Sequence, residues 1–240
     1  MSKLRNFTKK ILPNEFINYL RRLRSDLSRY HSLNDLDKKI EKYLPHSGGF
    51  FVELGANDGV SQSNTLYFER HKNWRGVLVE PTPHNYLKCL ANRSSHSHIF
   101  CNACVSFEYK DRFVEIAFSN LMSSPIGLES NVIDPIAHAE SGKRHLQSTE
   151  KVFTFGSVAT TLNELLSKSQ APKNIDFLSL DVEGAEIEVL KGIDHKVYRF
   201  KYMCIECWDI TKMTSYLNPL GYELKEKLSG HDYLFVDKNL

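Results

Sequence analysis

Short apolar runs alternate with helical patterns along most of the chain. The runs FFVEL (50–54), GVLVE (76–80) and IDFLSLD (175–181) are separated by segments in which apolar residues recur every three or four positions. Strands that alternate with helices in this way are typical of a parallel sheet with helices on its faces. The pattern therefore predicts an α/β fold built on a doubly wound, mostly parallel sheet.

Three segments depart from this alternation. The runs YELKEKL (222–228) and DYLFVD (232–237) are separated by only three residues, one of them a glycine, so we expect an antiparallel hairpin there. The run DRFVEIAFS (111–119) is expected to form an added hairpin strand. Residues 119–150 show no sustained period, and we expect them to form a long loop or lid.

The N-terminal part of the chain is basic, and its pattern is helical. Apolar residues over 14–30 form one helical stripe, and a second helical pattern over 33–44 ends before a proline. We expect a basic helical extension over residues 1–47, followed by one domain over residues 48–240. Two roles are open for the basic helix: it packs against the domain, or it contacts a membrane surface or a protein partner.

Charge is unevenly distributed over the chain. The formal net charge is +2, whereas residues 1–30 hold eight Lys or Arg and only two acids, so the remainder is mildly acidic. A nucleic-acid groove needs Lys and Arg clustered on its working face, so we expect no nucleic-acid partner for the main domain. No apolar run approaches the roughly 18 residues of a membrane span, and the N-terminus lacks the apolar core of a signal peptide. We therefore expect a cytoplasmic protein.

Four of the five cysteines form two C-x-x-C pairs, a spacing that also occurs in zinc sites. Cys101 and Cys104 lie in HIFCNACVS (98–106), and Cys204 and Cys207 lie in YMCIECW; both segments are expected to be buried strands. Residues three apart on a strand point to opposite faces, so two thiolates cannot converge on one metal ion. We expect reduced thiols that behave as small apolar residues.

A glycine-containing loop follows the first strand of the predicted sheet. Gly55 and Gly59 are four residues apart, which departs from the G-x-G-x-x-G of nicotinamide cofactor sites. Asp58 would also place a negative charge where a pyrophosphate would bind. A cofactor with a cationic sulfonium suits the carboxylates of Glu53 and Asp58, so we expect S-adenosylmethionine. The alternative for Glu53 is a strand-end carboxylate that caps nearby amides.

The ends of the second and third strands supply further cofactor contacts. Glu80, followed by Pro81, ends GVLVE, and its carboxylate can accept hydrogen bonds from both ribose hydroxyls. The alternative for Glu80 is an ordinary surface carboxylate. Asn102 is a candidate for the polar edge of the adenine, and Ala103 is small enough to let the ring pass.

Four blocks of the sequence resemble one known family. They are FVELGANDGVSQSNTLYFE, NWRGVLVEPTP, NACVS and IDFLSLDVEGAEIEVLKG. In this order they resemble the FkbM-type S-adenosylmethionine-dependent methyltransferases, over residues 49–237. The resemblance implies a class I methyltransferase (Rossmann-like) sheet of seven strands with the last strand antiparallel. It also implies O-methylation of sugars or other hydroxylated metabolites, so we expect a small-molecule or glycan acceptor.

The family motifs can be placed on individual residues of this chain. The resemblance implies that the turn at Ser63, Asn64 and Thr65 closes on the methionine end of the cofactor, and that Glu80 binds its ribose. Together, the expected cofactor contacts are Glu53, Gly55, Ala56, Asn57, Asp58, Gly59, Ser63, Asn64, Glu80, Pro81, Asn102, Ala103 and Asp181. The basic N-terminus and residues 119–150 depart from the family pattern, which leaves the acceptor open.

Transfer of a methyl group to a hydroxyl requires a group that takes the hydroxyl proton. Asp181 ends a central strand of the predicted sheet, beside the first strand, where ligands of such sheets bind. The catalytic candidates are Asp181, Glu183, Glu206 and His231. Asp181 and Glu206 could also hold a magnesium ion, which the sequence does not require.

Two of the acids near Asp181 have a purely structural alternative. A helix is expected from Gly184, and Glu183 and Glu186 can favour its dipole as acids of the first turn. Two other functions stay open beside the methyltransferase. One is a non-catalytic or regulatory module that keeps the cofactor pocket. The other is a nucleotide-cofactor oxidoreductase, which the missing G-x-G-x-x-G disfavours.

Overall fold

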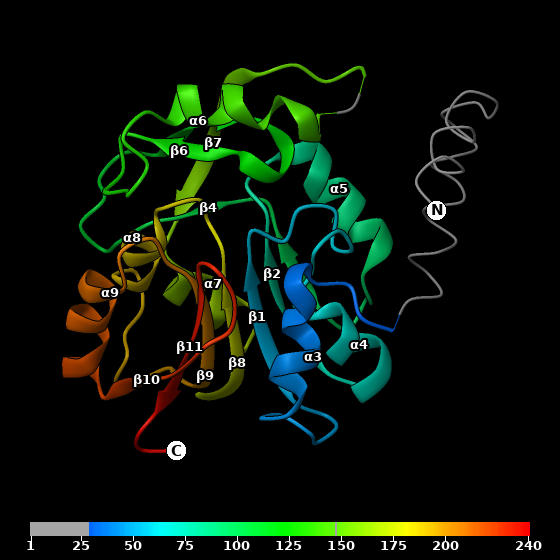
Figure 1. The fold of residues 1–240 in the computed structure, drawn as a ribbon, viewed down its shortest axis with the longest axis vertical. Coiled ribbons are helices and arrows are strands. Elements are labelled where there is room, and N and C mark those ends of the chain that lie inside the picture. The colour runs from blue at the N-terminus through cyan, green and yellow to red at the C-terminus, as the bar shows by residue number, and fades with distance from the viewer. Residues whose placement is uncertain (1–28, 147) are drawn as a thin grey trace.

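A seven-stranded sheet forms the centre of the protein (Figure 1). The computed structural model describes residues 29–146 and 148–240, so the helix expected over 14–30 lies outside them except for its last two positions. The strand order is β10-β11-β9-β8-β1-β2-β3. The strands are β1 (Phe50–Leu54), β2 (Arg75–Val79), β3 (His98–Phe100), β8 (Asn174–Leu180), β9 (Arg199–Glu206), β10 (Tyr222–Lys227) and β11 (Asp232–Asp237).

The pairing of the strands confirms the predicted sheet. β1, β2, β3, β8 and β9 run parallel, and β11 is antiparallel to both of its neighbours, β9 and β10. The order reverses between β1 and β8, because the chain first adds strands on one side of β1 and then crosses to the other side. Ligands of doubly wound sheets bind at the carboxyl ends of the strands at such a reversal.

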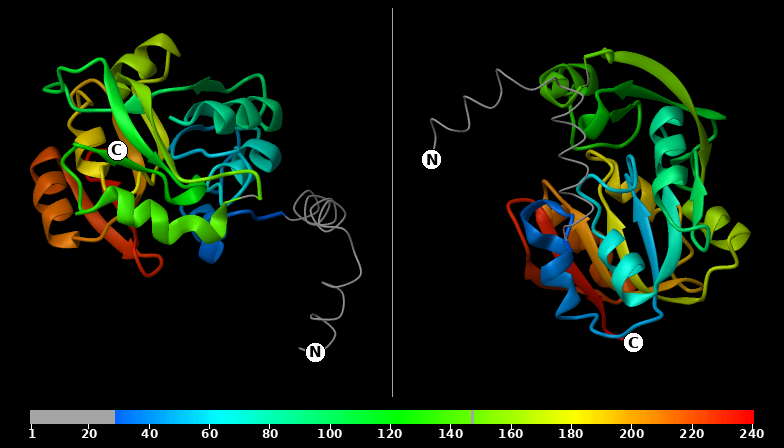
Figure 2. Two further views of the ribbon diagram at one scale, coloured as in Figure 1. Left: turned by 90° about the horizontal axis from the view of Figure 1, so that it is seen from above. Right: turned by 90° about the vertical axis from the view of Figure 1, so that its right-hand side faces the viewer.

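Helices cover both faces of the sheet, and each face buries its own apolar cluster (Figure 2). The β1 side chains alternate: Phe51 contributes to one cluster, whereas Val52 and Leu54 contribute to the other. On the Phe51 side lie α3 (Leu36–Glu41), α4 (Leu66–Lys72) and α5 (Pro83–Asn92), and on the other side lie α7 (Leu162–Lys168), α8 (Glu186–Leu190) and α9 (Ile210–Leu217). No helix among the described residues is long and apolar enough to cross a membrane.

The second N-terminal helical pattern, expected over 33–44, packs against the sheet. It forms a short 3-10 helix, η1 (Leu33–Asp35), followed by α3. Leu36, Ile40 and Leu44 are buried in the same cluster as Phe51 of β1. Asp37 holds the preceding turn, because its carboxylate accepts hydrogen bonds from the backbone N–H groups of residues 31 and 32.

A smaller sheet lies beyond the carboxyl ends of the central strands, at the top of Figure 1. Its strands, in order, are β4 (Ala103–Cys104), β7 (Phe153–Thr160), β5 (Phe113–Phe118) and β6 (Ser124–Ile126). β5 forms an antiparallel pair with β7, as expected for an added hairpin strand. The expectation of one strand over 98–106 is wrong, because β3 ends at Phe100 in the large sheet and β4 pairs with β7 in the small one.

The expectation of a structureless loop over 119–150 is also wrong. This segment, hereafter the cover segment, contains η2 (Asn120–Met122), β6, α6 (Pro135–Ser141) and η3 (Gly142–His145). These elements span only three to seven residues, too short for a period to emerge from the sequence. Asp134 caps α6 by accepting a hydrogen bond from the Ala137 N–H, and Pro135 begins the helix.

The cysteines follow the expected strand geometry. Cys204 is buried in the cluster on the Phe51 side of the sheet and Cys207 in the cluster on the opposite side. Cys89 and Cys104 are buried as well, whereas Cys101 is half-buried. Burial raises the pKa of the Cys104 thiol to about 12, which keeps it in the neutral form of an apolar side chain.

Gly55 allows the ends of two central strands to meet. Its φ is +79°, and a Cβ atom at this position would lie 1.9 Å from the backbone oxygen of Asp181, which follows β8. Gly55 also lines the cavity described below, where a glycine lets a ligand approach the backbone. The structure shows that it first accommodates the backbone of Asp181 itself.

We predict that Gly55→Ala destabilises the fold more than Gly48→Ala. Gly48 has a similar φ of +75° but no atom within 4 Å of its Cβ position, so it reports the conformational cost alone, about 1 kcal/mol. The Gly55 variant adds the clash with the Asp181 carbonyl, which we expect to cost a further 1–3 kcal/mol or so. Urea unfolding of both variants measures the difference, and equal losses of stability would contradict the proposed contact.

Candidate active site

A cavity of about 420 Å³ lies at the carboxyl ends of β1, β2, β8 and β9, next to the cover segment. All four catalytic candidates line it: Asp181, Glu183, Glu206 and His231. Ten of the thirteen expected cofactor contacts line it as well: Glu53, Gly55, Asn57, Ser63, Asn64, Glu80, Pro81, Asn102, Ala103 and Asp181. The volume is in the range of small-molecule sites, about 300–1,000 Å³.

The other three expected contacts, Ala56, Asp58 and Gly59, do not line the cavity. The Asp58 carboxylate accepts hydrogen bonds from the backbone N–H groups of Val60 and Ser61 at 2.9 and 2.7 Å, so it stabilises its own turn. These hydrogen bonds hold the Asp58 side chain away from the cavity. The expected contact of Asp58 with a cationic cofactor is therefore wrong.

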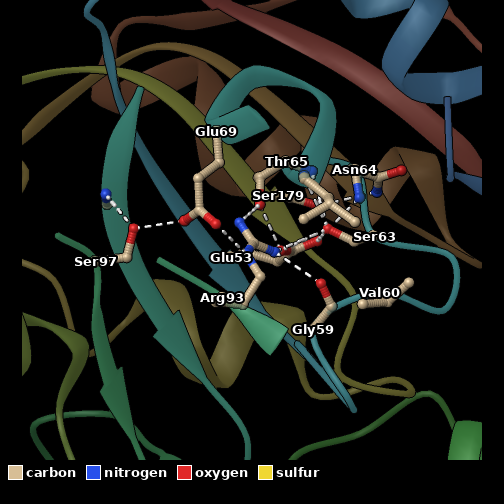
Figure 3. A network of polar contacts seen from close by, with 12 residues as sticks. Glu53, Gly59, Val60, Ser63, Asn64, Thr65, Glu69, Arg93, Ser97 and Ser179 are labelled. Atoms are coloured by element: carbon tan, nitrogen blue, oxygen red, sulfur yellow. Dashed lines mark hydrogen bonds and ion pairs between the residues drawn. The ribbon is translucent and has the colours of Figure 1, made fainter. Parts of the chain in front are cut away.

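Glu53 is the centre of a buried polar network (Figure 3). Its carboxylate accepts hydrogen bonds from Ser63 Oγ at 3.0 Å, from the Asn64 backbone N–H at 2.9 Å and from Thr65 Oγ1 at 2.5 Å. These contacts close the Ser63-Asn64-Thr65 turn on Glu53. The alternative interpretation of Glu53, a strand-end carboxylate that caps nearby amides, describes these contacts, although the residue also lines the cavity.

Arg93, at the end of α5, neutralises the carboxylates of this network. Its side chain is fully buried and forms ion pairs with Glu53 at 3.1 Å and with Glu69 of α4 at 3.0 Å. It also donates hydrogen bonds to the Gly59 carbonyl and to Thr65 Oγ1 (Figure 3). One guanidinium thus joins the end of β1, the loop after it and two helices. Arg93 could not be predicted as part of the site, because no local sequence pattern connects it to a carboxylate forty residues earlier.

Glu80 presents a carboxylate that is only partly used by the protein. Among the described residues, the backbone N–H groups of Asn57 and Thr82 each donate a hydrogen bond to one of its oxygens, both at 2.9 Å. Burial raises its pKa. Each oxygen can accept a second hydrogen bond, so the side chain retains capacity for two hydroxyl donors. The alternative of an ordinary surface carboxylate does not apply, since Glu80 is buried.

Asn64 carries an unsatisfied polar atom at the cavity. Its Nδ2 donates a hydrogen bond to Ser179 Oγ at 2.9 Å, which fixes the orientation of the amide. Its Oδ1 is buried and has no partner among the described residues, and the side chain lines the cavity. A buried oxygen without a partner is costly, so a ligand that donates a hydrogen bond here would be favoured.

Asp181 and Glu206 are neighbouring carboxyl groups on one wall of the cavity. Asp181 is exposed there, whereas Glu206 Oε2 is buried and has no hydrogen-bond partner among the described residues. Burial and the proximity of Glu206 raise the pKa of Asp181 well above its usual range. Burial, followed by the charge of Glu183, raises the pKa of Glu206 to about 8. With a pKa of about 8, the Glu206 carboxyl retains its proton at neutral pH, and this proton lies beside the Asp181 carboxyl.

The loop after Asp181 separates the roles of the two acids that follow. Glu183 lies in the left-handed region, with a φ of 55°, and precedes α8 rather than belonging to its first turn, so its structural alternative is wrong. Glu186 is the first residue of α8, and its carboxylate accepts hydrogen bonds from the Val182 and Gly184 backbone N–H groups. The assignment of Glu186 to the helix start is thus confirmed, whereas the expected helix start at Gly184 is two residues early.

Two residues that the sequence did not single out complete the cavity wall. His138 of α6 contacts Glu183, with 2.8 Å between Nε2 and Oε2, and this hydrogen bond raises the pKa of the histidine. Trp208 stacks on His231 with ring centroids 4.1 Å apart. A readable sign of α6 existed in the Asp134-Pro135 pair, which is typical of a helix start. Nothing in the sequence indicated that His138 would contact Glu183.

A seven-stranded sheet in this order, with its antiparallel last strand and a cavity at the switch point, is the class I methyltransferase architecture. The Methyltransferase FkbM domain family matches residues 53–224, and the chain belongs to this family. It is therefore a methyltransferase, and membership implies S-adenosylmethionine as its cofactor. No curated protein matches the chain.

The chain is similar to two solved methyltransferase structures. One is M. capricolum TrmK in complex with S-adenosylhomocysteine, with 10% identity, coverage of 86% of this chain and 68% of that one, and a TM-score of 0.44. The other is a SAM-dependent methyltransferase from Aquifex aeolicus, with 10% identity, coverage of 84% and 86%, and a TM-score of 0.40.

The residues at the cavity fit S-adenosylmethionine. The free acceptor capacity of Glu80 suits the two ribose hydroxyls, and the unpartnered Asn64 oxygen suits a donor such as an amino group. Among the described residues, no three His, Cys, Asp or Glu side chains are grouped so that they could hold a metal ion.

We predict that Arg93→Met destabilises the protein by about 3–5 kcal/mol, because it leaves the buried Glu53 and Glu69 carboxylates without their cation. Arg112→Met is the matched control, since Arg112 is exposed and loses only a surface charge and a contact with the Phe113 ring. Chemical unfolding of both variants tests this. Losses of equal size would show that Arg93 does not hold the network together.

We also predict that Glu206→Gln changes the pH dependence of stability. The folded protein raises the pKa of Glu206 from 4.5 to about 8 and so binds this proton more tightly than the unfolded chain does. Stability is therefore lost as the pH rises through this interval. The neutral glutamine removes that loss, so the variant gains stability over the wild type between pH 7 and pH 9 in thermal unfolding. The exposed Glu223→Gln control should follow the wild type, and parallel curves for all three proteins would contradict the assignment.

Proposed function

We propose that this methyltransferase transfers a methyl group to a hydroxyl of a sugar, a glycan or another small metabolite. The observation that carries this proposal is the Asp181–Glu206 carboxyl pair at the cavity. A pair that holds one proton can donate one hydrogen bond and accept another, as a hydroxyl acceptor requires. Two fully ionised carboxylates would favour a cationic amine instead.

The cofactor contacts follow from the free hydrogen-bonding capacity of the wall. S-adenosylmethionine, when bound, supplies a methyl group on a cationic sulfur. We assign its ribose hydroxyls to Glu80, its adenine to the space beside Asn102 and Ala103, and its amino acid end to the turn at Asn64. Asp181 and Glu206 then lie on the β8 and β9 side of the cavity, where the acceptor would be held.

The protein's contribution to the reaction is positioning. The Asp181–Glu206 pair orients the acceptor hydroxyl, and the cover segment forms the opposite wall through residues such as Met122 and Leu128. Holding two reactants in one geometry removes much of the entropic barrier to a displacement at carbon. The stacked Trp208 and His231 rings offer a flat apolar surface of the kind on which a sugar ring can pack.

A second function, a non-catalytic module that retains the cofactor pocket, is the alternative. It shares the Glu80 contacts but has no use for a carboxyl pair with a retained proton. The cytoplasmic location and the contact of the basic N-terminus with a membrane or protein partner are further proposals. They rest on sequence alone, because residues 1–28 lie outside the described part of the chain.

We predict that Glu80→Gln weakens binding of S-adenosylhomocysteine by about 10–100-fold, because an amide replaces a carboxylate that accepts two hydroxyl donors. Calorimetry with the wild type, this variant and the exposed Glu223→Gln control measures the change. Methyl transfer from labelled S-adenosylmethionine to a panel of monosaccharides, glycosides and small alcohols tests the activity, with alkali-stable methyl ethers as the expected products.

The two measurements separate the possible functions. Binding with transfer to a hydroxyl supports the O-methyltransferase, and binding without transfer to any acceptor favours the non-catalytic module. Products methylated only on nitrogen or carbon would overturn the proposed acceptor class. Unchanged affinity in Glu80→Gln would overturn the assignment of the ribose.

A further inference from the structure

We propose that His138, oriented by Glu183, is the base that takes the proton from the acceptor hydroxyl. This inference rests on the proposed O-methyltransferase function and names a residue outside the four catalytic candidates. His138 comes from α6 of the cover segment, whereas Glu183 comes from the loop after β8. The base would thus be assembled from two distant parts of the chain.

The geometry of the pair is that of a base and its orienting carboxylate. His138 Nε2 lies 2.8 Å from Glu183 Oε2, and the side chains are only 18% and 17% exposed. Both residues line the cavity. Many hydrolases activate a hydroxyl with a histidine that is hydrogen-bonded to a carboxylate beside the reaction site.

The backbone on the Glu183 side is held from several directions. Ser124 Oγ donates a hydrogen bond to the Glu183 carbonyl at 3.3 Å, and the Asn131 N–H donates one to the Gly184 carbonyl at 3.1 Å. Glu183 itself adopts a left-handed φ of 55°, a conformation that costs energy for a residue with a Cβ. Strained backbone that is over-determined by its surroundings is common at functional sites.

The hydrogen bond to Glu183 decides which nitrogen can act. In the neutral imidazole, Nε2–H donates to the Glu183 carboxylate, and the Nδ1 lone pair is left to accept a proton. Within the described part of the chain, Nδ1 has no hydrogen-bond partner. As the acceptor O–H bond breaks, its proton passes to Nδ1 and the oxygen bonds to the methyl carbon. The electron pair of the broken carbon–sulfur bond stays on sulfur, and the imidazolium is stabilised by Glu183.

The other titratable groups at the cavity are less suited to this role. Glu206, whose pKa is raised to about 8, already holds a proton at neutral pH, and the pKa of Asp181 beside it is raised as well. Arg144 Nε donates a hydrogen bond to His145 Nε2, so these two side chains of η3 are engaged with each other. His231 stacks on Trp208 at the tip of the β10–β11 hairpin.

The charges around His138 give the expected direction of its pH dependence. Glu183 is the carboxylate in contact with it, while Asp134, Glu140 and Lys143 lie on or next to its own helix. The hydrogen bond to Glu183 raises the pKa of His138 above 6.5. The imidazolium below this pKa cannot take a proton, so the rate should rise with pH through a value above 6.5.

The first test does not require turnover. NMR titration of the imidazole signals in the full-length protein bound to S-adenosylhomocysteine, with His138→Gln used for assignment, measures the pKa of His138. We expect Glu183→Gln to lower this pKa, whereas Glu140→Gln, an exposed change on the same helix, leaves it within a few tenths of the wild-type value. An unchanged value in Glu183→Gln would overturn the pairing.

The second test uses the best acceptor from the hydroxyl panel. His138→Gln can still bond to Glu183 but cannot take a proton, and we expect kcat to fall about 10²–10⁴-fold with little change in KM. His138→Ala should fall similarly and regain activity with added imidazole. In Glu183→Gln the alkaline rise in rate should shift to lower pH.

The outcomes distinguish this inference from the proposed function. A wild type that transfers no methyl group to any hydroxyl overturns the proposed function. A wild type and a His138→Gln variant that transfer at similar rates overturn the role of His138 alone. Loss of activity in His138→Ala without imidazole rescue, together with an unmoved pH profile in Glu183→Gln, would also overturn it, because a merely structural role predicts that result.

Discussion

The buried ion pair between Glu53 and Arg93 is the contact on which the cofactor side of the site depends. A carboxylate at the end of a central strand would be costly to bury alone, and a guanidinium from the end of α5 compensates it. With the charge balanced, Glu53 can accept hydrogen bonds from the turn at Ser63 to Thr65. That turn in turn places Asn64 at the cavity. Glu53, which the sequence suggested as a ligand contact, therefore supports another candidate contact, Asn64.

On the opposite side of the site, carboxyl groups gather without a Lys or Arg among the described residues to form an ion pair with them. Asp181, Glu183 and Glu206 lie together at the cavity, and His138 is the one described cation within contact distance of Glu183. Asp181 and Glu206 lower the stability of the fold at neutral pH, because their raised pKa values mean that the folded protein holds protons that the unfolded chain would release. Such a cost is common where a site needs poised acids and bases. On the cofactor side of the cavity the buried carboxylates are neutralised by Arg93, whereas on the opposite side the carboxyl groups have raised pKa values.

The sequence predicted the large sheet well and the small one poorly, for a physical reason. The strands at 50–54 and 174–180 are buried over most of their length, so they appear as mostly apolar runs in the sequence. In the cover segment each element is too short to produce a period.

The site followed the same division. Residues at strand ends, such as Glu80 and Asp181, could be located because the topology places all carboxyl ends at one edge. Asp58 could not be assigned correctly, because whether a loop acid faces a ligand or its own backbone depends on the turn it adopts. Arg93 and His138 act through partners 40 and 45 residues away, and such pairings exist only once the chain is folded.

The contact between Gly55 and the Asp181 carbonyl has a consequence for motion. Because the loop after β1 and the loop after β8 touch backbone to backbone, the two sides of the cavity cannot separate from each other without breaking the central sheet. Movement of the cover segment would break fewer backbone contacts, because it reaches the sheet side through the side chains of His138 and Ser124 and through the backbone N–H of Asn131. Such a movement would also separate His138 from Glu183. The proton-accepting pair would then form only when the cover segment closes over the bound acceptor.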